Sequence, residues 1–204
     1  MTTAPVKAPQ VTREARKFTV EEYFQMVEAG IIQDGERVEL IEGEILVMAP
    51  MGPSHIGGVT RYARVFIGLA GNLFTVLIQA TVRLSERSAP EPDLALVKFR
   101  EDDYSFAHAA PDDVLLIVEV ADSSLNYDRG VKAHIYGRAA IPETWVLNLP
   151  GDCLERFTEP GPEGYSQHAT LRRGDKVTPV ALPDVELEVE ALLPPVQSAA
   201  EGEE

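Results

Sequence analysis

Residues 114–149 read VLLIVEVADSSLNYDRGVKAHIYGRAAIPETWVLNL and decide the fold that we predict for this chain. The run from Val114 to Val118 is apolar and rich in β-branched residues, which is typical of a strand buried on both faces. A polar turn follows, then a helix-like segment from about Asp128 to Ala140, and then a second apolar run at 144–147. A strand, a helix and a strand at this spacing predict two parallel neighbouring strands joined by a crossover helix.

The composition is typical of one globular domain. The chain has 204 residues, of which 45% are hydrophobic and 25% are charged, which is enough for a full core. No apolar run approaches the length of a membrane span, and no charged-then-apolar leader opens the sequence. A single cysteine, Cys153, excludes an intramolecular disulfide framework and a cysteine-based zinc cluster. We therefore expect a cytoplasmic protein with no membrane partner.

The charge of the chain bears on the class of its partners. Its 33 acidic and 18 basic residues give a formal net charge of −15 at pH 7. Eight of the acidic residues lie in segments that we expect to be peripheral; without them, 25 acidic against 18 basic residues still leave −7. Nucleic-acid-binding proteins usually carry a basic surface, because contacts with phosphates supply much of their affinity. A polyanionic substrate would therefore require a local basic surface or bound metal ions.

The N-terminal part predicts a loose arm, a capped helix and a hairpin. Residues 1–17 show no periodicity and form the predicted flexible arm. Thr19 and Glu22 have the spacing of a capping box, and the apolar helix pattern that follows ends at Gly30. Two alternating segments then flank Glu42-Gly43, which predicts a hairpin.

A second helix and further strands follow the hairpin. We expect Ser54 to cap this helix, which runs to about Gly71. Its apolar stripe consists of Ile56, Val59, Tyr62, Ala63, Phe66 and Ile67. One or two strands are predicted at 74–84 and another at 94–97, before a polar loop at 100–113.

The sequence pattern of the C-terminal part differs from that of the centre of the chain. After Leu149, short alternating runs separated by proline and glycine predict an antiparallel meander appended to the core. Residues 194–204 have the composition of a disordered acidic tail. The predicted organisation is therefore an arm at 1–17, one domain at 18–193 and a tail at 194–204.

Three carboxylates are placed where they could hold a metal ion. Asp93 follows a proline and opens a strand, and Glu119 ends the most buried strand. Glu39 lies in a strand between two apolar residues, on the opposite face from both. If the strands of Asp93 and Glu119 are neighbours, their carboxylates can converge on one hard divalent cation, which prefers oxygen ligands.

The helix after Glu119 adds a possible cation to this site. Lys132 and Tyr136 are four residues apart and share a helical face with Asp128. A lysine beside a carboxylate pair can orient a water molecule or neutralise a developing oxyanion. An acid pair, a metal ion and a lysine together form a site suited to phosphodiester hydrolysis, because the metal lowers the pKa of its bound water.

Several short segments also carry a family resemblance. They are Glu39-Leu40-Ile41-Glu42-Gly43-Glu44, Pro53-Ser54-His55, Pro92-Asp93, Ile117-Val118-Glu119-Val120, Ser123-Ser124, and Asp128-Arg129 with Lys132 and Tyr136. In order and spacing they resemble the Uma-type family of putative restriction endonucleases, within the PD-(D/E)XK nuclease superfamily. The resemblance runs from about Phe18 to Leu193.

The resemblance implies a role for each matching residue. Asp93 corresponds to the metal-binding aspartate of the superfamily, and Glu119 to the acidic residue of its second motif. The superfamily lysine usually stands two residues later, where this chain has Ala121. In the Uma-type family the lysine is placed in the next helix, which makes Lys132 the candidate. Glu39 corresponds to an additional acidic position that completes the metal shell.

Three further residues are candidates for accessory roles in this site. His55 matches a recurrent polar residue at the head of the second helix, where a simple hydrogen bond at the helix start is the plainer role. Tyr136 and Asp128 are accessory candidates. Alternatively, Lys132 and Tyr136 form a solvated face with an Asp128–Lys132 pair worth only about 0.3–0.5 kcal/mol. Asn148 stands where relatives often carry an aspartate, a departure that weakens any role for it.

The three carboxylates also have structural alternatives. Asp93 after a proline could merely cap a turn. Glu119 could form a buried ion pair with Lys132 or Arg129, which need not be net favourable. Glu39 could be an exposed strand carboxylate. No Walker, dinucleotide-binding, serine-nucleophile or cysteine-nucleophile motif offers another site.

We therefore predict an α/β restriction-endonuclease-like core, with a mixed central sheet flanked by helices and an antiparallel extension on its C-terminal side. The expected function is an endonuclease that depends on Mg²⁺ or Mn²⁺ and acts on nucleic acid, DNA in the first instance, with a homodimer as a plausible assembly. The alternative is an inactive protein on the same scaffold that serves as an interaction or regulatory module. The negative net charge and the alanine at position 121 both favour that alternative.

Overall fold

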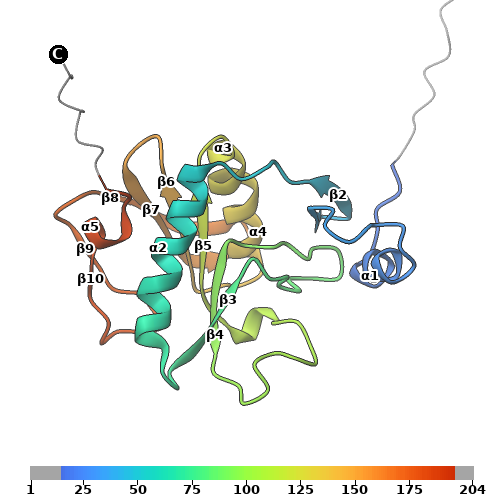
Figure 1. The fold of residues 1–204 in the computed structure, drawn as a ribbon, viewed down its shortest axis with the longest axis horizontal. Coiled ribbons are helices and arrows are strands. Elements are labelled where there is room, and N and C mark those ends of the chain that lie inside the picture. The colour runs from blue at the N-terminus through green and yellow to red at the C-terminus, as the bar shows by residue number, and fades with distance from the viewer. Residues whose placement is uncertain (1–14, 196–204) are drawn as a thin grey trace, which may run out of the picture.

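The computed structural model describes residues 15–195, and a six-stranded mixed sheet forms its centre (Figure 1). The strand order is β3-β4-β5-β6-β7-β8, and each neighbouring pair is antiparallel except β5 and β6. The bounds are Phe74–Ile78 (β3), Leu94–Lys98 (β4), Val114–Ala121 (β5), Glu143–Asn148 (β6), Cys153–Gly161 (β7) and Gly164–Leu171 (β8). The predicted parallel pair at the centre of a mixed sheet is thereby confirmed.

The crossover between β5 and β6 is helical but not a regular α-helix. It consists of α3 (Leu125–Tyr127), the π-helical turn η2 (Asp128–Lys132) and α4 (Ala133–Arg138). The prediction of one helix at 128–140 was therefore wrong in its bounds and in its regularity. The π turn is closed by the N–H of Ala133, which donates to the carbonyl of Asp128 five residues earlier. Such turns are frequent at functional sites.

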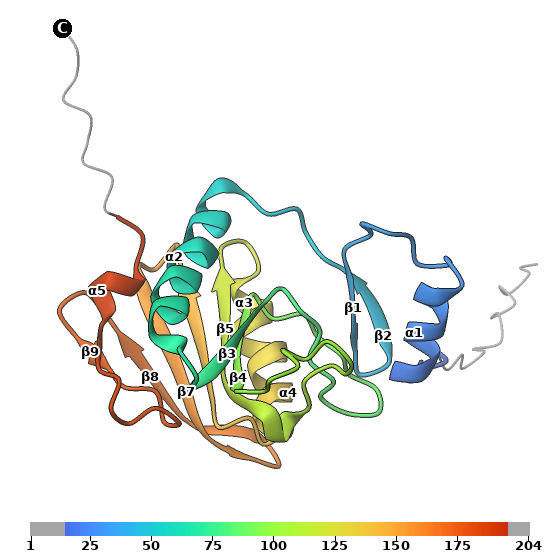
Figure 2. The same ribbon diagram turned by 60° about the horizontal axis from the view of Figure 1, so that its bottom comes forward.

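Two helices cover opposite faces of the sheet (Figure 2). On one face, Tyr62 and Phe66 of α2 (Pro53–Ala70) pack with Trp145 of β6. On the other face, Ile135 and Tyr136 of α4 pack with the alternate residues of β4 and β5. β5 is therefore buried on both faces, as its unbroken apolar run predicts.

The start and the packed face of α2 differ from the prediction. The residue before the helix is Gly52, and Ser54 lies inside the first turn without capping it. Ile56 and Ile67 are exposed rather than packed, because the buried side of the helix runs through Gly58, Val59, Tyr62, Ala63 and Phe66. Gly58 is required there, since an added Cβ would lie 2.7 Å from a methyl group of Val120.

The N-terminal helix and hairpin form a separate small core beside the sheet (Figure 2). Helix α1 (Val20–Glu28) has the predicted capping box, in which Thr19 and Glu22 satisfy each other's backbone N–H groups. The predicted hairpin consists of β1 (Val38–Ile41) and β2 (Glu44–Val47) and turns at Glu42-Gly43. Its contact with the rest of the chain includes a bridge between Leu40 and Ala89, and this contact brings β1 alongside the sheet.

The C-terminal part forms the predicted antiparallel extension. β7 and β8 form a long hairpin, and the short strands β9 (Lys176–Val177) and β10 (Leu187–Glu188) pair beyond it. Helix α5 (Val189–Leu192) then packs against α2, and a short 3-10 turn, η1 (Pro111–Asp113), precedes β5. Nearly all of the predicted arm and tail (1–14 and 196–204) lies outside the described residues. Within residues 15–195, no helix is long and apolar enough to cross a membrane.

Helix α4 approaches the β7–β8 hairpin at Gly137. A Cβ at this position would lie 2.6 Å from the backbone of Gly164 and Tyr165, so the backbone itself would have to move. We expect Gly137→Ala to lower the free energy of unfolding by about 3 kcal/mol. Gly68→Ala, on α2 with nothing within 4 Å, is the matched control and should be neutral or stabilising. Urea unfolding of both variants measures the difference, and equal stabilities would contradict this account of the packing.

Candidate active site

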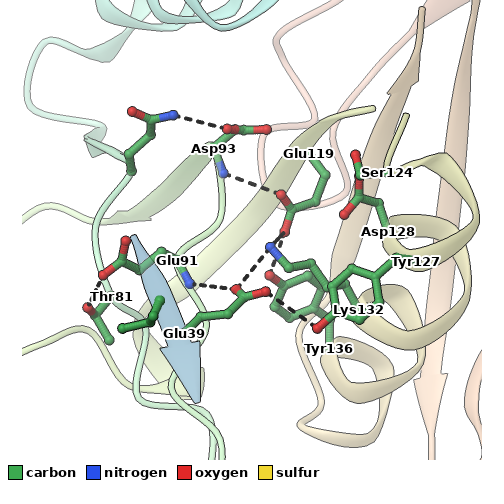
Figure 3. A network of polar contacts seen from close by, with 12 residues as sticks. Glu39, Thr81, Glu91, Asp93, Glu119, Ser124, Tyr127, Asp128, Lys132 and Tyr136 are labelled. Atoms are coloured by element: carbon green, nitrogen blue, oxygen red, sulfur yellow. Dashed lines mark hydrogen bonds and ion pairs between the residues drawn. The ribbon is translucent and has the colours of Figure 1, made fainter. Parts of the chain in front are cut away.

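The carboxylates of Asp93 and Glu119 lie on the same face of the sheet. The register pairs Leu94 of β4 with Val118 of β5, so Asp93 lies across from Glu119. Residues directly opposite in an antiparallel pair project from the same face, which here is the face that α4 covers. The two strands therefore bring these residues together, as the sequence predicts, although 26 positions separate them (Figure 3).

Asp93 is held by three polar groups around its side chain. The N–H of Val120 donates to Oδ2 at 2.8 Å, while His55 Nε2 and Gln79 Nε2 lie 2.9 and 3.3 Å from Oδ1. Asp93 is only 6% exposed, so its role is not that of a turn cap at the surface. Gln79 follows β3 directly and has a φ of 47°, a strained backbone conformation that is common near functional sites.

His55 reaches from the first turn of α2 to this carboxylate. The expected role of a simple hydrogen bond at the helix start is not what the structure shows, because the imidazole of His55 contacts the carboxylate of Asp93 instead of the helix backbone. The hydrogen bond with Asp93 raises the pKa of His55 above its usual value, against a smaller opposing effect of burial. The protonated imidazole is therefore favoured by the Asp93 carboxylate beside it.

Glu119 is almost completely buried at the end of β5. Its Oε1 accepts a hydrogen bond from the Tyr136 hydroxyl at 2.6 Å and lies 3.3 Å from Lys132 Nζ. Burial raises the pKa of Glu119 to about 8, although the charge of Lys132 acts in the opposite direction. The predicted ion pair between Glu119 and Lys132 is thus present, in the same place as the predicted site.

Lys132 bridges Glu119 to Glu39 of the N-terminal hairpin. Its Nζ lies 3.1 Å from Glu39 Oε2, and both side chains are buried. Burial alone would lower the pKa of Lys132, but the carboxylates of Glu119 and Glu39 raise it well above its usual value. The alternatives of an exposed Glu39 and of a solvated face with Lys132 and Tyr136 are therefore wrong.

Glu39 and Asp128 have polar partners of their own. The backbone N–H of Glu91 and the hydroxyl of Tyr127 lie 3.3 and 3.4 Å from the Glu39 carboxylate. The Ser124 hydroxyl donates to Asp128 at 2.5 Å, and burial raises the pKa of Asp128. Tyr127 and Gln79 were missed in the sequence, because neither a hydroxyl in a helix nor an amide after a strand marks a site by itself.

These side chains line a cavity of about 400 Å³ between the N-terminal hairpin, α2 and the end of β5. Six carboxylate residues line it, namely Glu39, Glu91, Asp93, Glu119, Asp122 and Asp128. Only two residues with a permanent positive charge, Arg37 and Lys132, are among the described residues that line it. Carboxylate residues therefore outnumber cationic residues in the lining, and the cavity favours cations.

The residues fit a divalent cation only in an open arrangement. Among residues 15–195, no three carboxylate, imidazole or thiol side chains gather closely enough to enclose a metal. Mg²⁺, however, usually takes one or two carboxylates and completes its shell with water and substrate phosphate. Asp93 and Glu119 are two carboxylate residues on neighbouring strands that line the cavity, whereas Asn148 does not line it and donates to Glu155.

The raised pKa of Glu119 predicts how stability depends on pH. A carboxyl that holds its proton more tightly when folded stabilises the protein at low pH, and this contribution is lost as pH rises from 4.5 toward 8. Glu119→Gln should therefore gain stability relative to wild type over this range, on the order of 3 kcal/mol. Urea unfolding at pH 5 and pH 8 tests this, with Glu44→Gln, at an exposed position, as the control. A constant difference between the two pH values would contradict the prediction.

Comparison with known proteins places this geometry in context. A family model described as putative restriction endonuclease, Uma2, matches residues 20–190. The crystal structure of a putative nuclease belonging to DUF820, from Anabaena variabilis ATCC 29413, superposes with a TM-score of 0.63. The similarity covers 86% of this chain and 97% of that chain at 12% sequence identity, so it concerns the fold alone, and it confirms the predicted fold class. No curated protein matches the sequence.

Proposed function

Because this chain belongs to the Uma2 family of putative restriction endonucleases, we propose that it hydrolyses phosphodiester bonds of nucleic acid with the help of a divalent cation. The observation that carries the proposal is that two buried carboxylate residues, Asp93 and Glu119, lie opposite each other on neighbouring strands, with the ammonium group of Lys132 3.3 Å from Glu119. These groups come from different strands and a helix, and all three line one cavity.

In this proposal, Asp93 and Glu119 hold Mg²⁺ or Mn²⁺ through their carboxylate oxygens. The ion would polarise the phosphate and lower the pKa of a bound water, which is the chemistry that metal ions supply in phosphodiester hydrolysis. The hydrogen bonds of Asp93 with Val120, His55 and Gln79 orient its carboxylate before any ligand binds. His55 and Gln79 are accordingly positioning residues.

Lys132 supplies the positive charge that the reaction needs beside the metal. Its ammonium group would hold the attacking water or stabilise negative charge on the phosphate, as pre-organised donors do in such sites. Glu39 binds this ammonium at 3.1 Å and also lies near two other donors. We therefore assign Glu39 to the positioning of Lys132, in place of the metal-ligand role expected from the sequence. Tyr136 holds Glu119 in the same way, and Asp128 adds negative charge.

The rival function is a non-catalytic interaction module. The negative charge of the cavity favours it, because this charge repels phosphates unless a cation intervenes. The other argument for it was the alanine at position 121, and Lys132 reaches Glu119 from the helix instead. DNA is the substrate that the family name suggests, and a homodimer would place two copies of the site in one assembly.

The test is metal-dependent cleavage by the full chain. Purified protein should nick plasmid DNA or cleave labelled oligonucleotides in Mn²⁺ or Mg²⁺ and should lose this activity in EDTA. Isothermal titration calorimetry should detect binding of Mn²⁺, and Ca²⁺ should compete with Mn²⁺ for the same site. Partner binding without metal binding and without cleavage would favour the interaction module.

A further inference from the structure

One part of the cavity wall plays no role in the chemistry above. It is the continuous segment from Leu46 to Met51, with the sequence LVMAPM, which connects the end of β2 to α2. All six of its residues are apolar and line the same cavity as the carboxylates. Val47 is 81% exposed, so part of this apolar segment is open to contact with a ligand.

The chemistry of this segment suits the flat, apolar face of a nucleobase. Apolar side chains commonly hold bases that have left the double helix. Methionine is unbranched and polarisable, so Met48 and Met51 can adapt to different rings. Arg37 lies beside the segment, where its guanidinium donates to the carbonyl of Ala49 at 3.2 Å. A phosphate next to the bound base would therefore have one cation within the cavity wall besides Lys132.

The charges around the cavity argue against a bound duplex. Proteins that bind duplex DNA neutralise several phosphates with basic residues. This cavity has six carboxylate residues and two permanent cations, and the whole chain carries a net charge of −15. A single unpaired nucleotide presents far fewer phosphates, and the arginine, the lysine and a metal ion could balance them.

The size of the cavity leads to the same conclusion. Its volume of about 400 Å³ falls within the range of about 300–1,000 Å³ that is typical of small-molecule sites. A duplex is much larger, since its major groove alone is about 12 Å wide. A base with its sugar and phosphate is the part of a nucleic acid that such a cavity can enclose.

We infer that this protein takes its substrate as an unpaired nucleotide, in a single-stranded or frayed segment of nucleic acid. The base lies against the segment Leu46–Met51, and the phosphate to be cleaved faces Asp93 and Glu119. This inference rests on the proposed nuclease function and adds the class of substrate. It also explains why the apolar segment and the acidic pair share one cavity.

The experiment compares strands of one sequence in the full-length protein. A labelled 20-nucleotide DNA strand, the matching RNA strand and the blunt DNA duplex are titrated by fluorescence anisotropy in Ca²⁺. We expect at least one single strand to bind about tenfold more tightly than the duplex. Met48→Gln and Val47→Ser should each weaken single-strand binding about five- to tenfold, by loss of base contacts. Ile67→Ser, at an exposed position of α2, is the control and should leave binding unchanged.

The outcomes separate this inference from the function on which it rests. Equal or tighter binding of the duplex, or full single-strand affinity in both segment variants, would overturn the unpaired-nucleotide site. Cleavage of each substrate in Mn²⁺ is measured in parallel. Single-strand preference without any cleavage would support the unpaired-nucleotide site and count against the nuclease function. Cleavage confined to the duplex would support the nuclease function and count against the unpaired-nucleotide site.

Discussion

Asp93→Asn should reduce metal-dependent cleavage by about 1,000-fold while leaving the fold intact. Asparagine has the same shape and keeps an oxygen to accept the hydrogen bond from the Val120 N–H. It lacks the charge that would hold a divalent cation, and loss of such electrostatic stabilisation commonly costs 100- to 1,000-fold in rate. Mn²⁺ binding measured by calorimetry should be lost together with cleavage.

The stability of the same variant gives a second, independent readout. Asp93 lies in a cavity with five other carboxylate residues, so its neutralisation removes repulsion among like charges when no metal is present. In EDTA the variant should therefore unfold at an equal or higher urea concentration than wild type. Asp122→Asn, which also lines the cavity but is exposed, is the control and should cleave at least as fast as wild type. Normal cleavage by Asp93→Asn would exclude the proposed metal site.

The order of elements could be predicted because local patterns determine them. The β-branched run at 114–118 is compatible with a buried strand, and Pro142 separates the crossover helix from the next strand. The pairing of Thr19 with Glu22 and the turn at Glu42-Gly43 likewise depend on neighbours in the sequence. These features lie within a few residues of one another, so a single sequence contains the information.

The surroundings of Glu39 could not be predicted in this way. In an isolated hairpin, alternate residues face solvent, and Glu39 would be one of them. Its burial results from the packing of that face against Lys132, 93 positions later, and against Tyr127. The π turn at Asp128–Lys132 was also invisible, because the same residues fit an α-helical pattern. Contacts between distant segments determine both the burial of Glu39 and the π turn, so neither can be predicted from the local sequence pattern.

Lys132→Met should destabilise the protein by about 3–5 kcal/mol and abolish cleavage. Methionine fills a similar volume, but Glu39 and Glu119 would lose the ammonium that lies within 3.3 Å of each. Removal of one partner from a buried ion pair is costly, because the remaining charge stays buried without compensation. Urea unfolding of the variant and of the wild type measures the loss.

A double variant separates the structural role of this lysine from its chemical role. Glu39→Gln removes one of the two carboxylates that Lys132 contacts. Combined with Lys132→Met, it should therefore recover part of the lost stability. The double-mutant cycle measures the interaction energy between Lys132 and Glu39. Cleavage should stay absent in the double variant, because no ammonium faces the phosphate. Glu39→Gln alone should retain metal binding and cleave more slowly, since Lys132 keeps Glu119 as its partner but loses its second anchor. If the double variant regained cleavage along with stability, Lys132 would be a structural counterion, and the amine in the reaction would have to come from elsewhere.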